Sequence, residues 1–151
     1  MSYLQRVMRP DETVRHWGQL HWVIYVPGIS LVASGAIATT AALAGVSGPL
    51  FPIIGFIGLL IGPVALAGAW YKRATTEIVV TDRRILLKTG WLARRTVEMN
   101  MDKVESVDVA QSLLGRMMDF GTVLVRGTGA GMEPLSKIAA PLNLRNSITV
   151  R

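Results

Sequence analysis

The distribution of charged and apolar residues divides the chain into three parts. From Trp22 to Tyr71 the sequence contains no Asp, Glu, Lys or Arg, whereas charged residues are frequent on both sides. This stretch is too long for one membrane-spanning helix, which needs about 20 apolar residues, and it suits two helices joined by a turn. Gly and Pro residues at positions 45–52 mark the turn. The pattern predicts a two-helix transmembrane hairpin over residues 22–71, with spans at about 22–44 and 51–71, after a short N-terminal segment, residues 1–21.

Residues typical of a membrane–water interface flank the predicted hairpin. The expected interface anchors are Trp17, Trp22, Tyr25, Trp70, Tyr71, Lys72 and Arg73. Aromatic rings favour the headgroup level and cations concentrate on the cytoplasmic side, while the turn at 45–52 carries no charge. We therefore expect a multi-pass protein with both termini in the cytoplasm. A signal peptide ending at 42–44 is disfavoured, because the apolar run before it exceeds the usual length of such signals.

Small residues recur at helical spacing within both predicted spans. The recurring positions are Ser30, Ser34, Ala38 and Ala42 in the first span, and Gly58 and Gly62 in the second. Small residues at this spacing let helices approach closely. We favour packing of the two spans against each other over oligomerisation of the protein through this face.

After Arg73 the pattern changes to short segments rich in β-branched or alternating apolar residues. The expected strands are residues 74–81, 84–88, 91–99, 104–109, 121–127 and 134–139. Ser112 has the chemistry of an N-cap for a short helical turn over 112–118, and residues 141–151 suit a weak helix or an extended tail. Short strands separated by Gly turns are typical of a small antiparallel barrel or sandwich. The sequence therefore predicts a mainly-β domain over residues 74–151.

Composition and charge agree with this division. Half of the residues are hydrophobic and only 17% are charged, below the roughly 25% of typical soluble domains. The net charge is +6, and residues 72–151 carry 13 Lys or Arg against 8 Asp or Glu. Basic residues beside membrane spans set orientation, so this charge indicates a cytoplasmic face rather than nucleic-acid binding. The absence of Cys excludes disulfides and thiol catalysis.

Several motifs of the C-terminal part resemble the bacterial pleckstrin-homology-like domains, a family once described as a domain of unknown function. Residues 76–85, TEIVVTDRRI, resemble its opening pattern Y-x-V-T-x-x-R-I. Further matching segments are residues 88–95, 101–107, 111–116, 120–123 and 127–129, and residues 9–12 with His21 and Trp22 resemble membrane-bound members. The resemblance implies a split, roll-like β-sandwich with a C-terminal helix, anchored by a two-span hairpin. It implies no known reaction, and the closing helix is shorter than is usual in the family.

No catalytic or metal-binding constellation stands out in the sequence. His16 and His21 are five residues apart, which is not the i, i+4 spacing of a helical ligand pair, and no carboxylate cluster accompanies them. Asp102, Glu105 and Asp108 could share one face of a helix, but in a strand they scatter, and we favour a solvated edge. The segment 127–131, GTGAG, lacks the further Gly of a dinucleotide fingerprint and the Lys of a P-loop, so a simple turn is favoured. We expect no enzyme activity, no cofactor and no metal.

The best candidate for a binding surface is a set of cations in the first strands of the predicted domain. These residues are Arg83, Arg84, Lys88, Arg94 and Arg95, which we expect to gather near one hairpin close to the membrane. Anionic lipids attract nearby cations, so headgroup contact competes with a merely solvated basic face. The leading functional hypothesis is a non-catalytic, membrane-anchored interaction module that binds protein partners or itself. The alternative is recognition of anionic lipid headgroups; a small transporter or enzyme is disfavoured.

Overall fold

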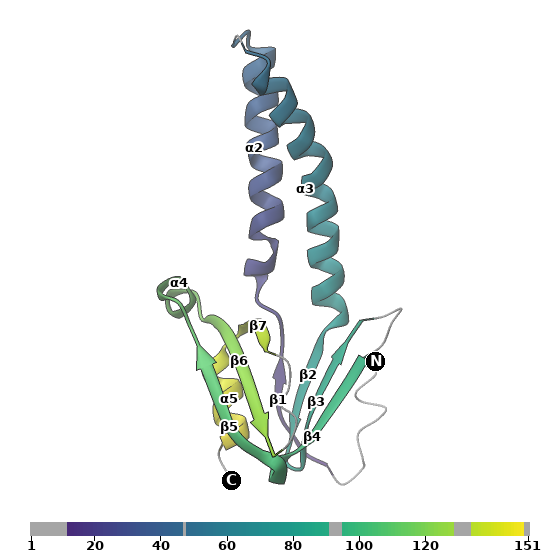
Figure 1. Cartoon of the computed structure of the whole chain (residues 1–151), viewed down its shortest axis with the longest axis vertical. Helices are drawn as coiled ribbons and strands as arrows, with labels where there is room; N and C mark the ends of the chain where they lie inside the picture. Colours follow the sequence, from purple (N-terminus) through teal and green to yellow (C-terminus); the bar gives the residue numbers. More distant parts are fainter. Residues whose placement is uncertain (1–11, 47, 91–94, 129–133, 150–151) are drawn as a thin grey trace. The chain divides into compact units, whose positions relative to one another are not determined.

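The computed structural model describes residues 12–46, 48–90, 95–128 and 134–149, and the chain divides into two compact units. The sheet unit comprises the described residues of 1–21 and 74–151, and the apolar hairpin comprises residues 22–73. The chain therefore begins in the sheet unit, leaves it to form the apolar hairpin and then returns to it (Figure 1).

In its described residues, the sheet unit contains seven antiparallel strands in two sheets. The first sheet has the order β1-β2-β3-β4 and the second has the order β5-β6-β7. The strands are β1 (Val14–Gly18), β2 (Glu77–Thr81), β3 (Arg84–Thr89), β4 (Arg95–Asn100), β5 (Val104–Ala110), β6 (Phe120–Gly127) and β7 (Leu135–Ala139). The helical elements are η2 (Met101–Lys103), α4 (Leu113–Met117) and α5 (Pro141–Thr149). The predicted fold class, with its short C-terminal helix, is confirmed.

Strand β1 joins the two sheets. It pairs with β2, with Gly18 opposite Ile78. The residues that follow reach the second sheet, where Leu20 forms a bridge with Ile138. The backbone N–H of His21 donates to the carbonyl of Lys137 at 2.7 Å, and the N–H of Ala139 donates to the carbonyl of Gln19 at 2.9 Å. Sequence patterning missed this strand, because VRHWG has no run of β-branched residues to indicate it.

The core of the sheet unit is formed by the apolar side chains of both sheets and of α5. The buried residues include Ile78, Val80 and Ile85 of the first sheet, Val123, Val125 and Ile138 of the second, and Leu144 and Ile148 of α5. Helix α5 contacts β5, β6, β1 and β2, so it covers residues from both sheets (Figure 1). Because Leu144 and Ile148 are four residues apart, they lie on one helical face and explain why this short segment is helical.

The apolar hairpin consists of η1 (Trp22–Tyr25), α2 (Val26–Leu43) and α3 (Leu50–Thr75). Its two helices are long and apolar enough to cross a membrane. They meet backbone to backbone at glycines: a Cβ added to Gly58 would lie 2.7 Å from Cα of Gly35, and one added to Gly35 would lie 2.8 Å from the backbone N of Leu59. The structure thus confirms that small residues pack the two helices against each other.

The contact face of α2 differs in part from the predicted one. Its buried residues are Gly28, Gly35 and Ala38, whereas Ser30 and Ser34 are exposed. The two serine hydroxyls donate to the carbonyls of Pro27 and Leu31, at 2.9 and 3.0 Å. These bonds satisfy the hydroxyls within the helix itself, so neither serine needs a partner on α3.

The close approach at Gly58 predicts opposite effects for two Gly→Ala changes in α3. Gly58→Ala should destabilise the hairpin by about 1–3 kcal/mol, because its Cβ meets backbone atoms of α2 that can shift only with the whole helix. Gly68→Ala meets nothing within 4 Å and should be neutral or stabilise by up to about 1 kcal/mol. Thermal unfolding in detergent, followed by far-UV circular dichroism, would measure both. Equal Tm values for the two variants would contradict the packing.

Candidate functional site

Both connections to the apolar hairpin leave the sheet unit at one end, which we call the junction end. The first connection follows β1, whose last residue, Gly18, lies opposite Ile78 near the start of β2. The second connection leads directly into β2, where Glu77 lies opposite Lys88. The junction end also holds the β3–β4 connection, because Thr89 pairs with Arg95. It holds the β5–β6 connection too, because Gly121, at the start of β6, pairs with Ile138, the bridge partner of Leu20.

The opposite end of the sheet unit, the distal end, holds the turn between β2 and β3. Thr81 closes this turn: its hydroxyl accepts from the backbone N–H of Arg84 at 3.0 Å and donates to the Arg84 carbonyl at 2.9 Å. The backbone N–H of Met101 donates to the carbonyl of Arg83, which joins the turn to η2. Two of the five predicted headgroup cations, Arg83 and Arg84, therefore lie at the end away from the hairpin connections.

Arg84 is engaged by two carboxylates. Its Nε lies 3.0 Å from Oε1 of Glu12, its Nη2 lies 3.0 Å from Oε2 of Glu12, and its Nη1 lies 2.7 Å from Oε1 of Glu98. The side chain of Arg84 is 10% exposed and that of Glu12 is 1% exposed. The hydrogen bond to Glu98 raises the pKa of Arg84, burial lowers it and the bond to Glu12 raises it again, with a net increase. This cation ties the N-terminal segment to the β3–β4 pair.

Lys88 is also a buried cation beside a carboxylate. Its Nζ lies 3.8 Å from Oε1 of Glu77, the residue opposite it on β2. Because long side chains on paired residues of one sheet face lie side by side, this pair follows from the β2–β3 register. Lys88 lies at the junction end, and its burial leaves little of its charge exposed to an external anion.

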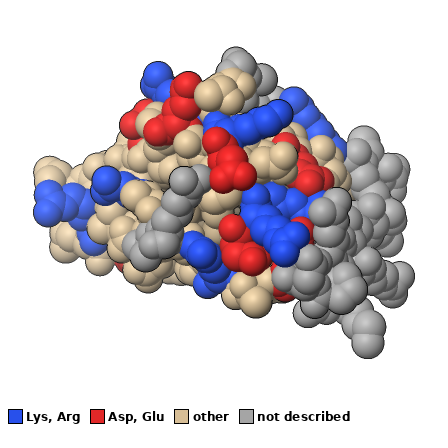
Figure 2. Space-filling view, turned by 90° about the horizontal axis from the view of Figure 1, so that it is seen from below, with Lys and Arg blue, Asp and Glu red and all other residues tan. Residues whose placement is uncertain are grey.

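The predicted gathering of the five cations is not found in the described residues. Arg83 and Arg95 are both exposed but lie at opposite ends of β3, about 20 Å apart at about 3.3 Å per residue. Arg94 lies outside the described residues. Figure 2 shows Lys and Arg interleaved with Asp and Glu on one face of the molecule, rather than one basic surface. The cause is the strand direction, which separates cations that are close in sequence; headgroup contact by single residues stays a prediction.

The predicted interface anchors belong to both units. Trp17 lies in β1, opposite Val79, and therefore in the sheet unit. In the apolar hairpin, Trp22 and Tyr25 form the ends of η1, and the last turns of α3 carry Trp70, Tyr71, Lys72 and Arg73. The guanidinium of Arg73 lies over the ring of Tyr25, 5.7 Å from its centroid. This cation–π contact joins α3 to η1 within the hairpin.

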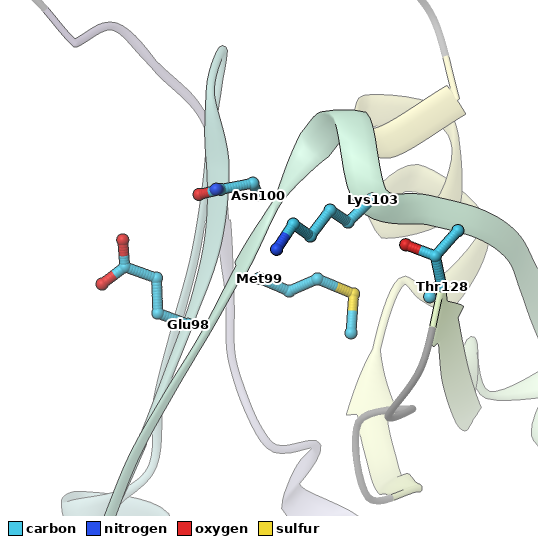
Figure 3. A pocket seen from close by; sticks show the side chains of 6 residues that line it. Glu98, Met99, Asn100, Lys103 and Thr128 are labelled. Carbon is cyan, nitrogen blue, oxygen red and sulfur yellow. The ribbon is translucent and has the colours of Figure 1, made fainter.

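A pocket of about 420 Å³ opens at the distal end. Its lining residues are Glu98, Met99, Asn100, Lys103, Gly127 and Thr128. Figure 3 shows the Lys103 side chain extending across the pocket, while the Glu98 carboxylate points away from it. The polar groups of the lining are therefore one cation, one carboxylate, the amide of Asn100 and the hydroxyl of Thr128.

The other residues considered as catalytic or metal-binding candidates pack against, or pair with, neighbouring strands. His16 lies opposite Val80 in the first sheet, and His21 stacks on Phe120 with ring centroids 5.3 Å apart. Asp108 lies 3.2 Å from Nε of Arg126 on the neighbouring strand. Among the described residues, no group of three or more His, Cys, Asp or Glu could hold a metal ion. Of the segment 127–131, residues 129–131 lie outside the described part of the chain.

One surface was missed by the sequence analysis, although the element that carries it was predicted. The turn after Ser112 is helical as expected, and the Ser112 hydroxyl accepts from the N–H of Gly115 at 3.0 Å, which confirms the N-cap. The large apolar side chains of this helix, α4, are exposed rather than buried. The sequence did contain a signal for this exposure. Leu113, Leu114 and Met117 stand at i, i+1 and i+4 of a five-residue helix, which is too short to bury three large apolar side chains.

The buried pair predicts a large effect of Arg84 and a small one of a matched surface arginine. Arg84→Met should destabilise the sheet unit by about 3–5 kcal/mol, because it leaves the Glu12 carboxylate buried without its cation. Arg126→Met removes an exposed pair and should cost less than about 1 kcal/mol. Urea unfolding of the full chain in detergent, followed by Trp fluorescence, measures both. Similar midpoints for the two variants would show that the Arg84 pair does not stabilise the fold.

Comparison with known protein families identifies the family to which this fold belongs. The family model of the bacterial PH domain matches residues 24–149, which is most of the chain. No curated protein and no solved structure matches the chain significantly. The match covers the apolar hairpin together with the strands from β2 onward and α5, in agreement with the motifs at 76–85 and 111–116. The chain belongs to the bacterial PH domain family.

Proposed function

We propose that this protein is a membrane-anchored interaction module, in which the apolar hairpin spans a membrane and the sheet unit binds a protein partner or a second copy at the cytoplasmic face. The observation that carries the proposal is the insertion of the hairpin between β1 and β2, with both connections at the junction end. The chain thus enters and leaves the sheet unit at one end, as suits a domain that is anchored there and leaves its other surfaces to a partner. Membership of the bacterial PH domain family supports an interaction module.

The dimensions and surroundings of the helices support the anchoring. The segments Trp22–Leu43 and Leu50–Thr75 extend about 33 and 39 Å at about 1.5 Å per residue, against a hydrocarbon core of about 30 Å. Only 17% of the apolar window in each helix is buried, so most of its apolar surface needs another cover. Lys72 and Arg73 close α3, whereas the loop at 44–49 has no charge, which favours a cytoplasmic location of the sheet unit.

The β4 strand offers a surface for a protein partner. It is the outer strand of its sheet, paired with β3 in the described structure. An outer strand presents a row of backbone donors and acceptors to which a further strand can add. Four of its six residues are exposed, among them Thr96 and Glu98. We infer that partner or self-association uses this edge.

The alternative, recognition of anionic headgroups, has less support from the charge placement. Arg84 and Lys88 are buried beside carboxylates, and Arg83 lies at the distal end. Among the described members of the basic set, Arg95 is the exposed one at the junction end. One exposed cation contributes about 1 kcal/mol at an anionic membrane surface, which is too little to define a lipid-recognition module.

The proposed orientation predicts which positions react from outside the cell. Because the chain contains no Cys, single substitutions give an unambiguous signal. Gly45→Cys, in the loop of the hairpin, should react with a membrane-impermeant maleimide on intact spheroplasts. Lys103→Cys, in η2 of the sheet unit, should react only after lysis. Labelling of Lys103→Cys on intact spheroplasts would show that the orientation is opposite to the proposed one. Extraction of the unmodified protein by alkaline carbonate would refute the anchoring.

Photo-crosslinking in native membranes tests the β4 edge. A benzophenone attached at Thr96→Cys should give a discrete adduct, either at twice the mass of the chain or with a partner. The matched control is Asn143→Cys, an exposed position on α5 that lies away from the edge strand. Equal adducts from both positions would show random collision, and a monomer free of adducts after gentle extraction would contradict the interaction module.

A further inference from the structure

Helix α4 (Leu113–Met117) presents three large apolar side chains to solvent. Leu113 is 80% exposed, Leu114 is 66% exposed and Met117 is 83% exposed. They belong to one short connection between β5 and β6, so they form a compact apolar knob rather than scattered surface residues. Exposed apolar groups gathered in this way mark a binding surface more often than isolated ones do.

The backbone beneath the knob is held firmly, so the exposure is a fixed property of the fold. The Ser112 hydroxyl caps the helix, and Nε2 of Gln111 donates to the carbonyls of Gly115 and Phe120 at 3.4 and 3.2 Å. Gly115 is buried against β6, and a Cβ there would lie 2.6 Å from the Phe120 carbonyl oxygen. Because the small residue of the helix faces inward, Leu113, Leu114 and Met117 face outward.

The knob lies at the junction end of the sheet unit. The β5–β6 ladder ends at Ala110 opposite Thr122, and α4 connects the strands just beyond this pair (Figure 1). Phe120, against which Gly115 packs, stacks on the ring of His21. His21 is the last residue before Trp22, where the apolar hairpin begins. A short series of contacts within the sheet unit therefore connects α4 to the point where the chain leaves for the hairpin.

We propose that α4 inserts Leu113, Leu114 and Met117 into the interfacial layer of the membrane that the hairpin spans. This inference rests on the membrane anchoring proposed above. The charge within the knob favours a lipid surface: Arg116, in the last turn of α4, is exposed and is the one charged residue of 110–118, whereas the acid Asp119 follows the helix just before β6. An arginine beside apolar residues can place its guanidinium at the headgroups while the apolar side chains enter the acyl boundary.

Insertion of α4 gives the sheet unit a further support at the membrane besides its two covalent connections. Two connections define an axis about which the unit can still turn, whereas a third contact away from that axis fixes its tilt. The β4 edge belongs to the other sheet from α4, so a fixed tilt keeps that edge at a constant angle to the membrane. The knob thus acts as a positioning element for the proposed interaction.

Depth-dependent fluorescence quenching in vesicles tests the insertion with the full chain. Leu114→Cys and Met117→Cys are labelled separately with an environment-sensitive fluorophore and reconstituted into phosphatidylcholine–phosphatidylglycerol vesicles. We expect a blue-shifted emission and at least about twofold quenching by lipids with a nitroxide near the headgroup end of the acyl chain, since interfacial helices bury their apolar face about 5–10 Å deep. Lys103→Cys, in η2 at the distal end, should show neither effect.

A label at Phe56→Cys, an exposed position within α3, separates failure of this inference from failure of the anchoring. Quenching of the Phe56→Cys label by deep nitroxides together with an unquenched, red-shifted Leu114→Cys label would overturn the insertion and leave the anchoring intact. A blue-shifted but unquenched Leu114→Cys label would mean that protein covers the knob, which also overturns the insertion. An unquenched Phe56→Cys label would overturn both proposals.

Discussion

The sheet unit depends on the double pairing of its first strand. Residues 14–18 pair with β2, and the residues after them hydrogen bond to β7, so one continuous segment joins the two sheets. Because Gly18 must reach Ile78 and His21 must reach Lys137, the chain can leave the unit only at the junction end. The positions of both hairpin connections, of the β3–β4 connection and of α4 follow from this requirement and from the antiparallel alternation of the strands.

The positive net charge of this chain is not evidence for one basic binding surface, because several of the cations are paired with carboxylates. Arg84 and Lys88 both lie in β3 beside carboxylates, where Lys88 faces the paired strand β2 and Arg84 holds the N-terminal segment through Glu12. Arg126 and Asp108 form a similar pair at the surface. These three cations are therefore neutralised locally, and apolar contacts, through the hairpin and α4, carry the proposed association with a membrane.

Most of the fold could be predicted from the sequence, because its signals are local. The absence of charge over 22–71 defines both long helices, a β-branched run defines β2, and the apolar run 85–87 defines β3. The segment Val14–Gly18 lacks such a signal, because its strand exists through pairing with residues beyond the hairpin.

The positions of the predicted headgroup cations could not be predicted from the sequence. Spacing along the chain does not reveal that Arg83 and Arg95 lie near opposite ends of β3, or that Glu12 reaches Arg84. Exposure of α4 likewise depends on the inward position of Gly115, which only the packed structure defines.

The place of β1 in the chain has a consequence for how the protein is made. During synthesis β1 emerges before the hairpin, whereas its partners β2 and β7 emerge after it. Pairings between segments so distant in sequence form late, and they form slowly. Helix α5, which covers β1 and β2, is the last described element to leave the ribosome. Folding of the sheet unit can therefore finish only once the two apolar helices have been synthesised and β1 and β2 have been brought together. Completion of the sheet unit is thus coupled to correct placement of the hairpin.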